Sequence, residues 1–201
     1  MRKMNKIIAI DGPAASGKGT LARKLAAHLG LKYLDTGSLY RAVALKKLET
    51  GGEPHEIAKN LKEEDLHSPK LRDEDVGNMA SEISAIPAVR ENLLQWQRDF
   101  AVQGAVLDGR DIGTVICPDA DVKFYIHASV EVRAERRFVE LSRHNPHTTL
   151  EHIQKDLEER DNRDMHRAVC PLLPAHDAIR IDTSDVNADE VFQKAIGYIK
   201  S

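Results

Sequence analysis

A glycine-rich segment near the start of the sequence limits the possible folds of this chain more than any other feature. Residues 12–20 read GPAASGKGT. Residues 6–10 before it, a lysine followed by four apolar residues, are expected to form a buried strand, and residues 18–29 after it carry leucine and alanine at helical spacing. A chance glycine-rich turn is the alternative interpretation. A strand, such a loop and a helix in this order predict a phosphate-binding loop, formed by Gly12, Pro13, Ala14, Ala15, Ser16, Gly17, Lys18, Gly19 and Thr20.

Lys18 places a full positive charge in this loop, where the β- and γ-phosphates of a nucleoside triphosphate would lie. The next position departs from the common form of the motif, because Gly19 stands where serine or threonine is expected. The hydroxyl group follows one residue later, at Thr20. The loop alone does not distinguish among the many proteins that bind nucleoside triphosphates.

The rest of the chain alternates between segments typical of strands and segments typical of helices. Further strands are expected at residues 33–35, 105–107, 122–126 and 178–181. Residues 53–100 are the exception, because they are polar and helical in pattern and contain no convincing strand. This alternation predicts an α/β fold of three layers, in which a central parallel sheet of five strands is covered by helices on both faces.

Several helix ends can be placed from capping residues. Gly30 follows the first helix, and Thr36 or Ser38 is expected to cap a helix that reaches about residue 50. A capping box is predicted at Thr148 with Glu151, and a second one at Asn187 with Glu190.

Composition excludes some classes of partner. The net charge of −3 gives no general electrostatic attraction for nucleic acid or membrane surfaces. The apolar run at residues 7–10 is too short for a signal peptide or a membrane span. Cys117 and Cys170 lie far apart without metal-ligand spacing, so we expect reduced thiols and a cytoplasmic protein. Because the net charge is negative, we expect an anionic ligand to bind at a local cluster of arginines.

Two charged clusters follow predicted strands. Asp35 to Arg41 comes after the second strand, and Asp108-Gly109-Arg110-Asp111 comes after the third. Both are expected at the carboxyl edge of the sheet, where open α/β folds bind ligands. Arg41 is suited to a bidentate contact with a phosphate. The alternatives are a helix cap with a surface arginine for the first cluster, and a salt-bridged loop for the second.

A third cluster lies on a late helix. At about 100° per residue, Asp164 and Arg167 lie within about 40° of Arg160 on one helical face. This face is either an exposed ladder of ion pairs or a group of cations that contacts phosphates. The preceding helix carries Arg136 among further arginines, and a short polar loop follows it, so that residues 140–150 are typical of a lid that closes over ATP.

Together these motifs resemble those of cytidylate kinases, which are nucleoside monophosphate kinases with a phosphate-binding loop. The matching stretches are residues 10–45, 81–94, 106–128 and 159–174, about half of the chain, and the most specific are DGRDIGTV from Asp108 and ERDNRD from Glu159. The resemblance implies a monomer with a core of residues 1–52 and 101–201, a lid near 140–150 and a nucleoside monophosphate-binding insert at 53–100.

The resemblance also assigns roles to single residues. It implies that the acceptor nucleotide is bound by Thr36, Ser81, Arg90, Arg110, Asp111, Arg160, Asp164 and Arg167. From their positions in the sequence, we also expect Arg41 at the acceptor and Arg136 at the ATP site. The sequence departs from the family pattern at two points. Thr36 replaces a serine that is common in the family, and residues 53–72 are too short for the small antiparallel sheet of many bacterial members.

We therefore expect ATP-dependent phosphorylation of CMP and dCMP, a step of pyrimidine nucleotide metabolism, by in-line transfer without a phosphoenzyme. The expected catalytic cations are Lys18, Arg110, Arg160 and Arg167. Mg²⁺ is expected to bind with ATP at Thr20, with Asp108 as a weaker candidate that acts through water. The alternatives are a kinase for UMP, another nucleotide or a small metabolite, and a nucleotide-binding switch without catalytic activity.

Overall fold

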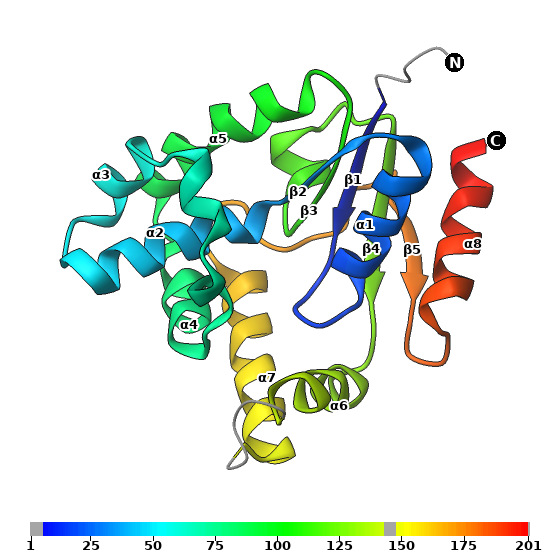
Figure 1. The fold of residues 1–201 in the computed structure, drawn as a ribbon. Helices are drawn as coiled ribbons and strands as arrows, with labels where there is room; N and C mark the ends of the chain where they lie inside the picture. Colours follow the sequence, from blue (N-terminus) through cyan, green and yellow to red (C-terminus); the bar gives the residue numbers. More distant parts are fainter. Residues whose placement is uncertain (1–5, 143–147, 201) are drawn as a thin grey trace.

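The computed structural model describes residues 6–142 and 148–200, and its centre is a parallel sheet of five strands (Figure 1). The strand order is β2-β3-β1-β4-β5, so the phosphate loop follows the central strand. Because β3 is buried along its whole length, the sheet is covered on both faces, as the sequence predicted. The strands are β1 (Ile7–Asp11), β2 (Lys32–Asp35), β3 (Ala105–Gly109), β4 (Val122–His127) and β5 (Ile179–Asp182).

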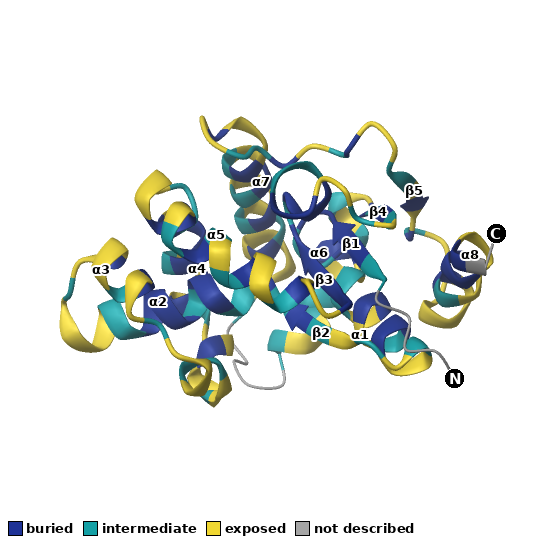
Figure 2. Cartoon of the chain, turned by 90° about the horizontal axis from the view of Figure 1, so that it is seen from above, coloured by how far each residue is buried: buried dark blue, intermediate teal, exposed yellow. Residues whose placement is uncertain are grey.

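Helices form the two outer layers. Ile8 and Ile10 of β1 pack toward α1 (Lys18–Leu29) and α8 (Ala188–Lys200), whereas Ala9 between them packs toward the other face. That second face is covered by α5 (Pro87–Ala101) and the short helical turn η3 (Ile112–Ile116). Figure 2 shows the buried strands between these exposed helical surfaces. The period-two alternation of a strand thus gives each sheet face its own apolar core.

A second apolar cluster lies beside the sheet and joins α2 (Thr36–Thr50) to the segment that follows it. Its other elements are α3 (Pro54–Lys59), η2 (Pro69–Arg72), α4 (Glu74–Ile83) and α5, while η1 (Glu63–His67) contributes a partly buried leucine. Residues 53–100 therefore form helices without a strand. Because α2 packs into the same cluster, the division of the chain at residue 52 stays a prediction.

The helices α6 (Val130–Leu141) and α7 (Leu150–His166) pack against each other below the sheet edge. Ala134, Ile153 and Leu157 form the apolar contact, and a buried ion pair joins Arg133 Nη2 to Asp161 Oδ2 at 2.6 Å. Residues 143–147, the middle of the predicted lid at 140–150, lie outside the described part of the chain. None of the helices that the structure describes is long and apolar enough to cross a lipid bilayer.

Two of the predicted helix caps were wrong and two are confirmed, one of which is Gly30 at the C-terminal end of α1. Thr149, not Thr148, caps α7, because its Oγ1 accepts a hydrogen bond from His152 N at 3.2 Å. Neither Thr36 nor Ser38 caps α2: the helix begins at Thr36, and both hydroxyls donate to carbonyl groups instead. The box at residues 187 and 190 forms as expected, with both reciprocal hydrogen bonds present.

Candidate active site

The phosphate loop turns sharply between β1 and α1. Gly12 has φ of 153°, and a Cβ atom there would lie 2.0 Å from the carbonyl oxygen of Ile126, so only glycine fits. Gly17, with φ of 87°, occupies the N-cap position of α1 without a side-chain cap. The hydroxyl of Ser16 is buried and has no hydrogen-bond partner within the described structure. These features leave the start of α1 free to receive an anion.

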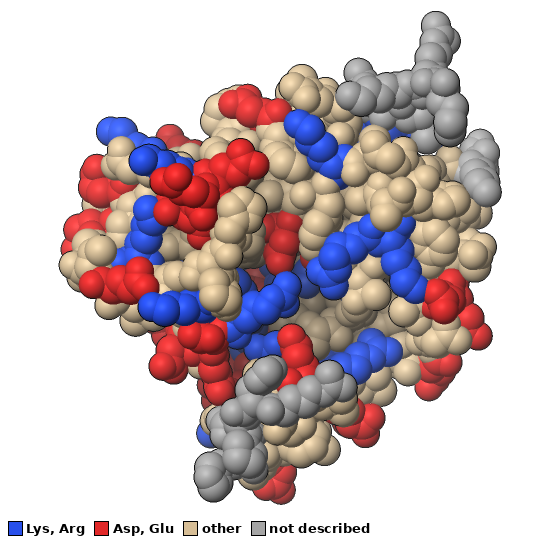
Figure 3. Space-filling view, viewed as in Figure 1, with Lys and Arg blue, Asp and Glu red and all other residues tan. Residues whose placement is uncertain are grey.

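A cleft of about 320 Å³ opens beside this loop (Figure 3). The hollow in the centre of this face is bordered by many Lys and Arg side chains. The structure brings most of the predicted site residues to its walls: Ala14, Ala15, Ser16, Gly17, Lys18, Gly19, Thr20, Thr36, Arg41, Ser81, Arg90, Asp108, Arg110, Asp111, Arg160, Asp164 and Arg167.

One part of the cleft, which we name the phosphate half, consists of Lys18, Arg41 and Arg160. In the described part of the chain, none of these cations has a carboxylate within ion-pair distance. Burial, together with the charge of Arg110, lowers the pKa of Lys18 to about 8. Burial and neighbouring arginines also lower the pKa of Arg41 and Arg160. The phosphate half is therefore a half-buried positive region that an anion would stabilise.

The hydrogen bonds of these cations confirm that they lack anionic partners in this state. Lys18 Nζ donates to the carbonyl oxygen of Pro13 at 3.4 Å, and Arg41 Nη1 donates to that of Leu71 at 2.8 Å. The Nε of Arg160 is buried without any partner within the described residues. A ligand with several phosphate oxygens would complete this hydrogen bonding.

The other part of the cleft, which we name the paired half, contains arginines that already have carboxylate partners. Arg90 forms a buried ion pair with Asp111, and Arg110 Nε donates to Asp164 Oδ2 at 2.7 Å. Arg167 lies 3.5 Å from Asp111 and 4.0 Å from Asp164. Burial alone would raise the pKa of Asp164, but Arg110 and Arg160 hold it below its ordinary value. The network joins the end of β3 to α5 and α7.

Two further contacts extend the paired half. The guanidinium of Arg90 lies 5.5 Å from the ring centre of Tyr40, which is a cation–π distance. Arg163 Nη1 donates to Ser81 Oγ at 2.8 Å and so connects α7 with α4. Ser81 is buried yet faces the cleft, although the sequence pattern marked it only as part of a helix.

Asp11 holds the segment that carries Asp111 in place. Its two carboxylate oxygens accept hydrogen bonds from Ile112 N and Gly113 N, both at 2.8 Å. Because the carboxyl group is buried, its pKa rises to about 7, while these two hydrogen bonds act in the opposite direction. The last residue of β1 thereby fixes the turn that follows Asp111.

Asp108 lies at the junction of the loop and the sheet edge. The hydroxyl of Tyr33 donates to its Oδ1 at 2.9 Å. Burial, followed by the charge of Asp35, raises its pKa to about 6, which Lys18 partly counteracts. A Cβ atom at Gly19 would lie 3.3 Å from Asp108 Oδ2. The close approach of this carboxylate explains why glycine, and not serine or threonine, follows the lysine of the motif.

Oxygen donors suited to Mg²⁺ lie in the same region. Thr20 is in the first turn of α1. Asp35 is the last residue of β2, and it pairs with Asp108 in the neighbouring strand β3. All three line the cleft beside Lys18. A hydroxyl and carboxylates fit a hard cation that keeps several water ligands and also binds phosphate oxygens.

Arg136 lies away from the walls of the cleft. Its guanidinium donates to Thr183 O at 2.5 Å and to Thr183 Oγ1 at 3.0 Å. Thr183 in turn donates to the carbonyl of Ser16 at 3.0 Å, which places Arg136 behind the phosphate loop. Its contact with ATP stays a prediction. Gly12 and Pro13 also lie outside the cleft lining, at the base of the loop.

Sequence reasoning missed several residues that line the cleft. Arg137 faces it because one residue along a helix rotates a side chain by about 100° from Arg136. Tyr33 belongs to β2, whose carboxyl end pairs with Asp108, so its position on this edge was a usable signal. No local pattern distinguished Arg23, Arg72, Ser84 and Glu140. Asp35 and Tyr40 also line the cleft, as members of the predicted cluster at 35–41 to which no individual role was given.

Comparison with known proteins agrees with this geometry. The family description "Cytidylate kinase" matches residues 8–62 and 55–201. A cytidylate kinase of Paramagnetospirillum magneticum is 51% identical over 209 residues, covering 98% of this chain and 99% of the relative. One of Azorhizobium caulinodans is 50% identical, covering 96% and 98%.

Solved structures with low sequence identity share the fold. An uncharacterised protein from Eubacterium ventriosum aligns with a TM-score of 0.57 at 18% identity, covering 98% of this chain and 99% of that protein. A gluconokinase from Sinorhizobium meliloti aligns with a TM-score of 0.51 at 15% identity, covering 98% and 92%. At this identity the likeness concerns the three-layer fold alone.

Proposed function

The chain belongs to the cytidylate kinase family and phosphorylates CMP and dCMP, and we propose that the two halves of its cleft divide this reaction between them. The phosphate half binds the phosphates of ATP and the phosphate of the acceptor. The paired half binds the sugar and base of the acceptor, and two of its arginines, Arg110 and Arg167, are also assigned to the transferring phosphoryl group. The observation that carries this proposal is a group of half-buried cations that have no carboxylate partner among the described residues, directly beside arginines that form buried ion pairs.

In the proposed mechanism the phosphate loop and Lys18 hold ATP, and Arg110, Arg160 and Arg167 stabilise the transferring phosphoryl group. The acceptor phosphate is already anionic at neutral pH, so the reaction needs no general base. Catalysis then consists of alignment for in-line transfer and of stabilising the charge on the equatorial oxygens. Lys18 and Arg160 line the same cleft within the basic region, which suits this role.

We assign the Mg²⁺ that accompanies ATP to Thr20, with Asp108 in contact through water. When bound, Mg²⁺ would neutralise charge on the β- and γ-phosphates. Tyr33 would orient Asp108 through its hydroxyl hydrogen bond. Because Lys18 lies beside Asp108, the two side chains would hold opposite sides of the phosphate chain.

For the acceptor nucleotide, Asp111 is assigned to the ribose and Ser81 to the cytosine. Arg90 and Arg167 already contact Asp111, so its carboxylate is fixed before a sugar hydroxyl donates to it. Thr36 Oγ1 donates to Asp108 O at 2.8 Å, which leaves its lone pairs free to accept a hydrogen bond. Arg41 would hold the acceptor phosphate, and Asp164 would keep Arg110 in place.

We further propose that the enzyme works as a cytoplasmic monomer, with residues 53–100 as the acceptor insert and Arg136 on the ATP side. The two cysteines are unpaired, as expected in a reducing compartment. The cleft is assembled from elements of a single chain, so the proposed site needs no residue from a second copy.

An initial-rate panel with CMP, dCMP, UMP and AMP at fixed Mg·ATP tests the acceptor assignment. We expect CMP and dCMP to be turned over with the highest kcat/KM. Faster turnover of UMP or AMP would overturn the assignment of CMP and dCMP as acceptors. The shortened insert would then be the first place to look for the changed base selectivity.

The Asp111→Ala variant tests the division of the cleft. Loss of this carboxylate should raise the KM for CMP far more than the KM for ATP, because Asp111 belongs to the paired half. Asp189→Ala, which removes an exposed carboxylate from α8, serves as the control and should change neither constant. An equal rise in both KM values would contradict the role of Asp111 at the acceptor.

A further inference from the structure

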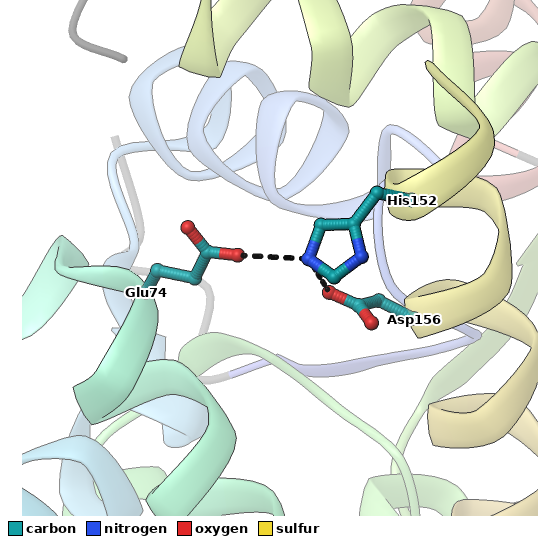
Figure 4. A group of neighbouring side chains, drawn as sticks. All are labelled: Glu74, His152 and Asp156. Atoms are coloured by element: carbon teal, nitrogen blue, oxygen red, sulfur yellow. Dashed lines mark ion pairs between the residues drawn. The ribbon is translucent and has the colours of Figure 1, made fainter. Parts of the chain in front are cut away.

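A second group of polar side chains lies outside the cleft, where α4 and α7 meet near their N-terminal ends. It consists of Glu74 from α4 and of His152 and Asp156 from α7 (Figure 4). His152 Nε2 lies 3.9 Å from Glu74 Oε1 and 3.4 Å from Asp156 Oδ2. One ligand atom from each residue falls within a mutual distance of 4.8 Å. The proposed reaction uses none of these residues.

The charges of this group are not balanced when the imidazole is neutral. Within the described residues, His152 is the sole ion-pair partner of both Glu74 and Asp156. Two carboxylates then lie within 4.8 Å of each other, and no lysine or arginine of the described residues lies within ion-pair distance of either. Such an arrangement is repulsive, and a bound divalent cation would reverse its sign.

The geometry also suits coordination. His152 and Asp156 are four residues apart on one helix, so their side chains project from the same face. The backbone of His152 is fixed by its hydrogen bond to the capping Thr149. The imidazole is 60% exposed and the carboxylates 37% and 40%, which leaves room for water as a further ligand. One nitrogen and two oxygen ligands favour Zn²⁺ or a similar transition metal over Mg²⁺.

We propose that Glu74, His152 and Asp156 bind one divalent transition-metal ion of the Zn²⁺ class. The ion links α4 to α7, because Glu74 comes from one helix and the other two ligands from the second (Figure 4). The same two helices are joined nearer the cleft by the hydrogen bond from Arg163 to Ser81. A metal ion would therefore connect the acceptor insert and the arginine-bearing helix at a second level, away from the substrates.

Calorimetric titration of the full, nucleotide-free chain with ZnCl₂, after removal of metals with a chelator, tests the proposal. We expect one site whose affinity falls by about tenfold or more in His152→Ala and also in Glu74→Gln, since each loses a ligand. His176→Ala is the matched control, because it removes a more exposed histidine that has one neighbouring carboxylate. This control should bind Zn²⁺ as the unmodified chain does.

Two results would overturn the proposal. Unchanged Zn²⁺ affinity in His152→Ala would place the ion elsewhere on the chain. Loss of affinity in His152→Ala together with full affinity in Glu74→Gln would reduce the site to one helix and remove the link. The visible absorption of bound Co²⁺ provides a second measurement, and the spectrum should change in both ligand variants but not in the control. Circular dichroism of each variant verifies that it is folded.

Discussion

The phosphate half and the paired half of the cleft both contain basic side chains, but only in the paired half do carboxylates balance their charges. Arg90 and Arg110 in the paired half each contact a buried carboxylate. Lys18, Arg41 and Arg160 in the phosphate half contact none within the described chain, and the pKa of each is lowered. In our proposal the unpaired cations therefore receive the phosphates. The balanced network receives the sugar and the base, while its Arg110 and Arg167 also act on the transferring phosphoryl group.

The two halves also carry different energetic costs. An unpaired cation in a partly buried site loses hydration without a compensating contact, so the free enzyme is destabilised there until an anion binds. A paired cation has already regained that energy in the free enzyme. Removal of one partner from the paired half therefore leaves the other partner as an unpaired buried charge. Removal of a cation from the phosphate half instead takes away a charge that was already unpaired.

The largest expected effect concerns Arg90. Replacement by methionine should leave the buried Asp111 with a weaker set of partners and lower the free energy of unfolding by about 3–5 kcal/mol. Urea denaturation of the nucleotide-free variant measures this change. Arg180→Met, at an exposed position of β5, is the control and should stay within about 0.5 kcal/mol of the unmodified chain. If Arg90→Met also lowered the free energy of unfolding by no more than about 0.5 kcal/mol, the ion pair between Arg90 and Asp111 would not balance the charges of the paired half.

The next effect concerns catalysis. Lys18→Ala should lower kcat by about 10²–10³-fold, because the contact of Lys18 with the migrating charge strengthens in the transition state. Lys24→Ala, on the same helix but paired with Asp189 at the surface, should keep kcat. Steady-state kinetics distinguishes the two. A rise in the KM for ATP with unchanged kcat would restrict Lys18 to ground-state binding.

A smaller effect concerns pH. The pKa of Lys18 in the free enzyme is about 8, whereas a lysine in an unfolded chain keeps its proton to higher pH. The free energy of unfolding of the free enzyme should therefore increase as the pH rises above 8. Bound phosphates favour the charged lysine, so ATP binding takes up a proton in this range. The affinity for ATP should therefore fall by up to about tenfold per pH unit above pH 8.

Calorimetric titrations of ATP between pH 7.5 and 9.5 measure this dependence. Lys18→Ala should lose the slope, whereas Lys24→Ala should retain it. An affinity that stays constant over this interval in the unmodified enzyme would contradict the unpaired state of Lys18.

The core of the fold and the edge that carries the site were predictable from the sequence. The phosphate loop was identified because strand, glycines, lysine and helix are contiguous, and both charged clusters follow strands whose carboxyl ends share one edge. Such features are local, or follow from the rule that parallel strands end together. The five strands and their parallel arrangement are therefore confirmed.

Contacts between distant segments were not predictable in the same way. Ser81 and Arg90 entered through the family resemblance alone, since their partners lie 82 and 21 residues away. The choice between Arg136 and Arg137 depends on the rotation of α6, and that between Thr148 and Thr149 on where α7 begins. A shift of one residue decides both, and helix boundaries are not specified that finely by capping patterns.

The most direct test of the contrast between the halves is the free energy of unfolding of Arg160→Met, compared with Arg90→Met, in urea without nucleotide. If Arg160 is an unpaired buried cation, its replacement by an apolar side chain should leave the stability unchanged or raise it, although phosphoryl transfer is lost. A loss of about 3 kcal/mol or more, equal to that expected for Arg90→Met, would contradict the account.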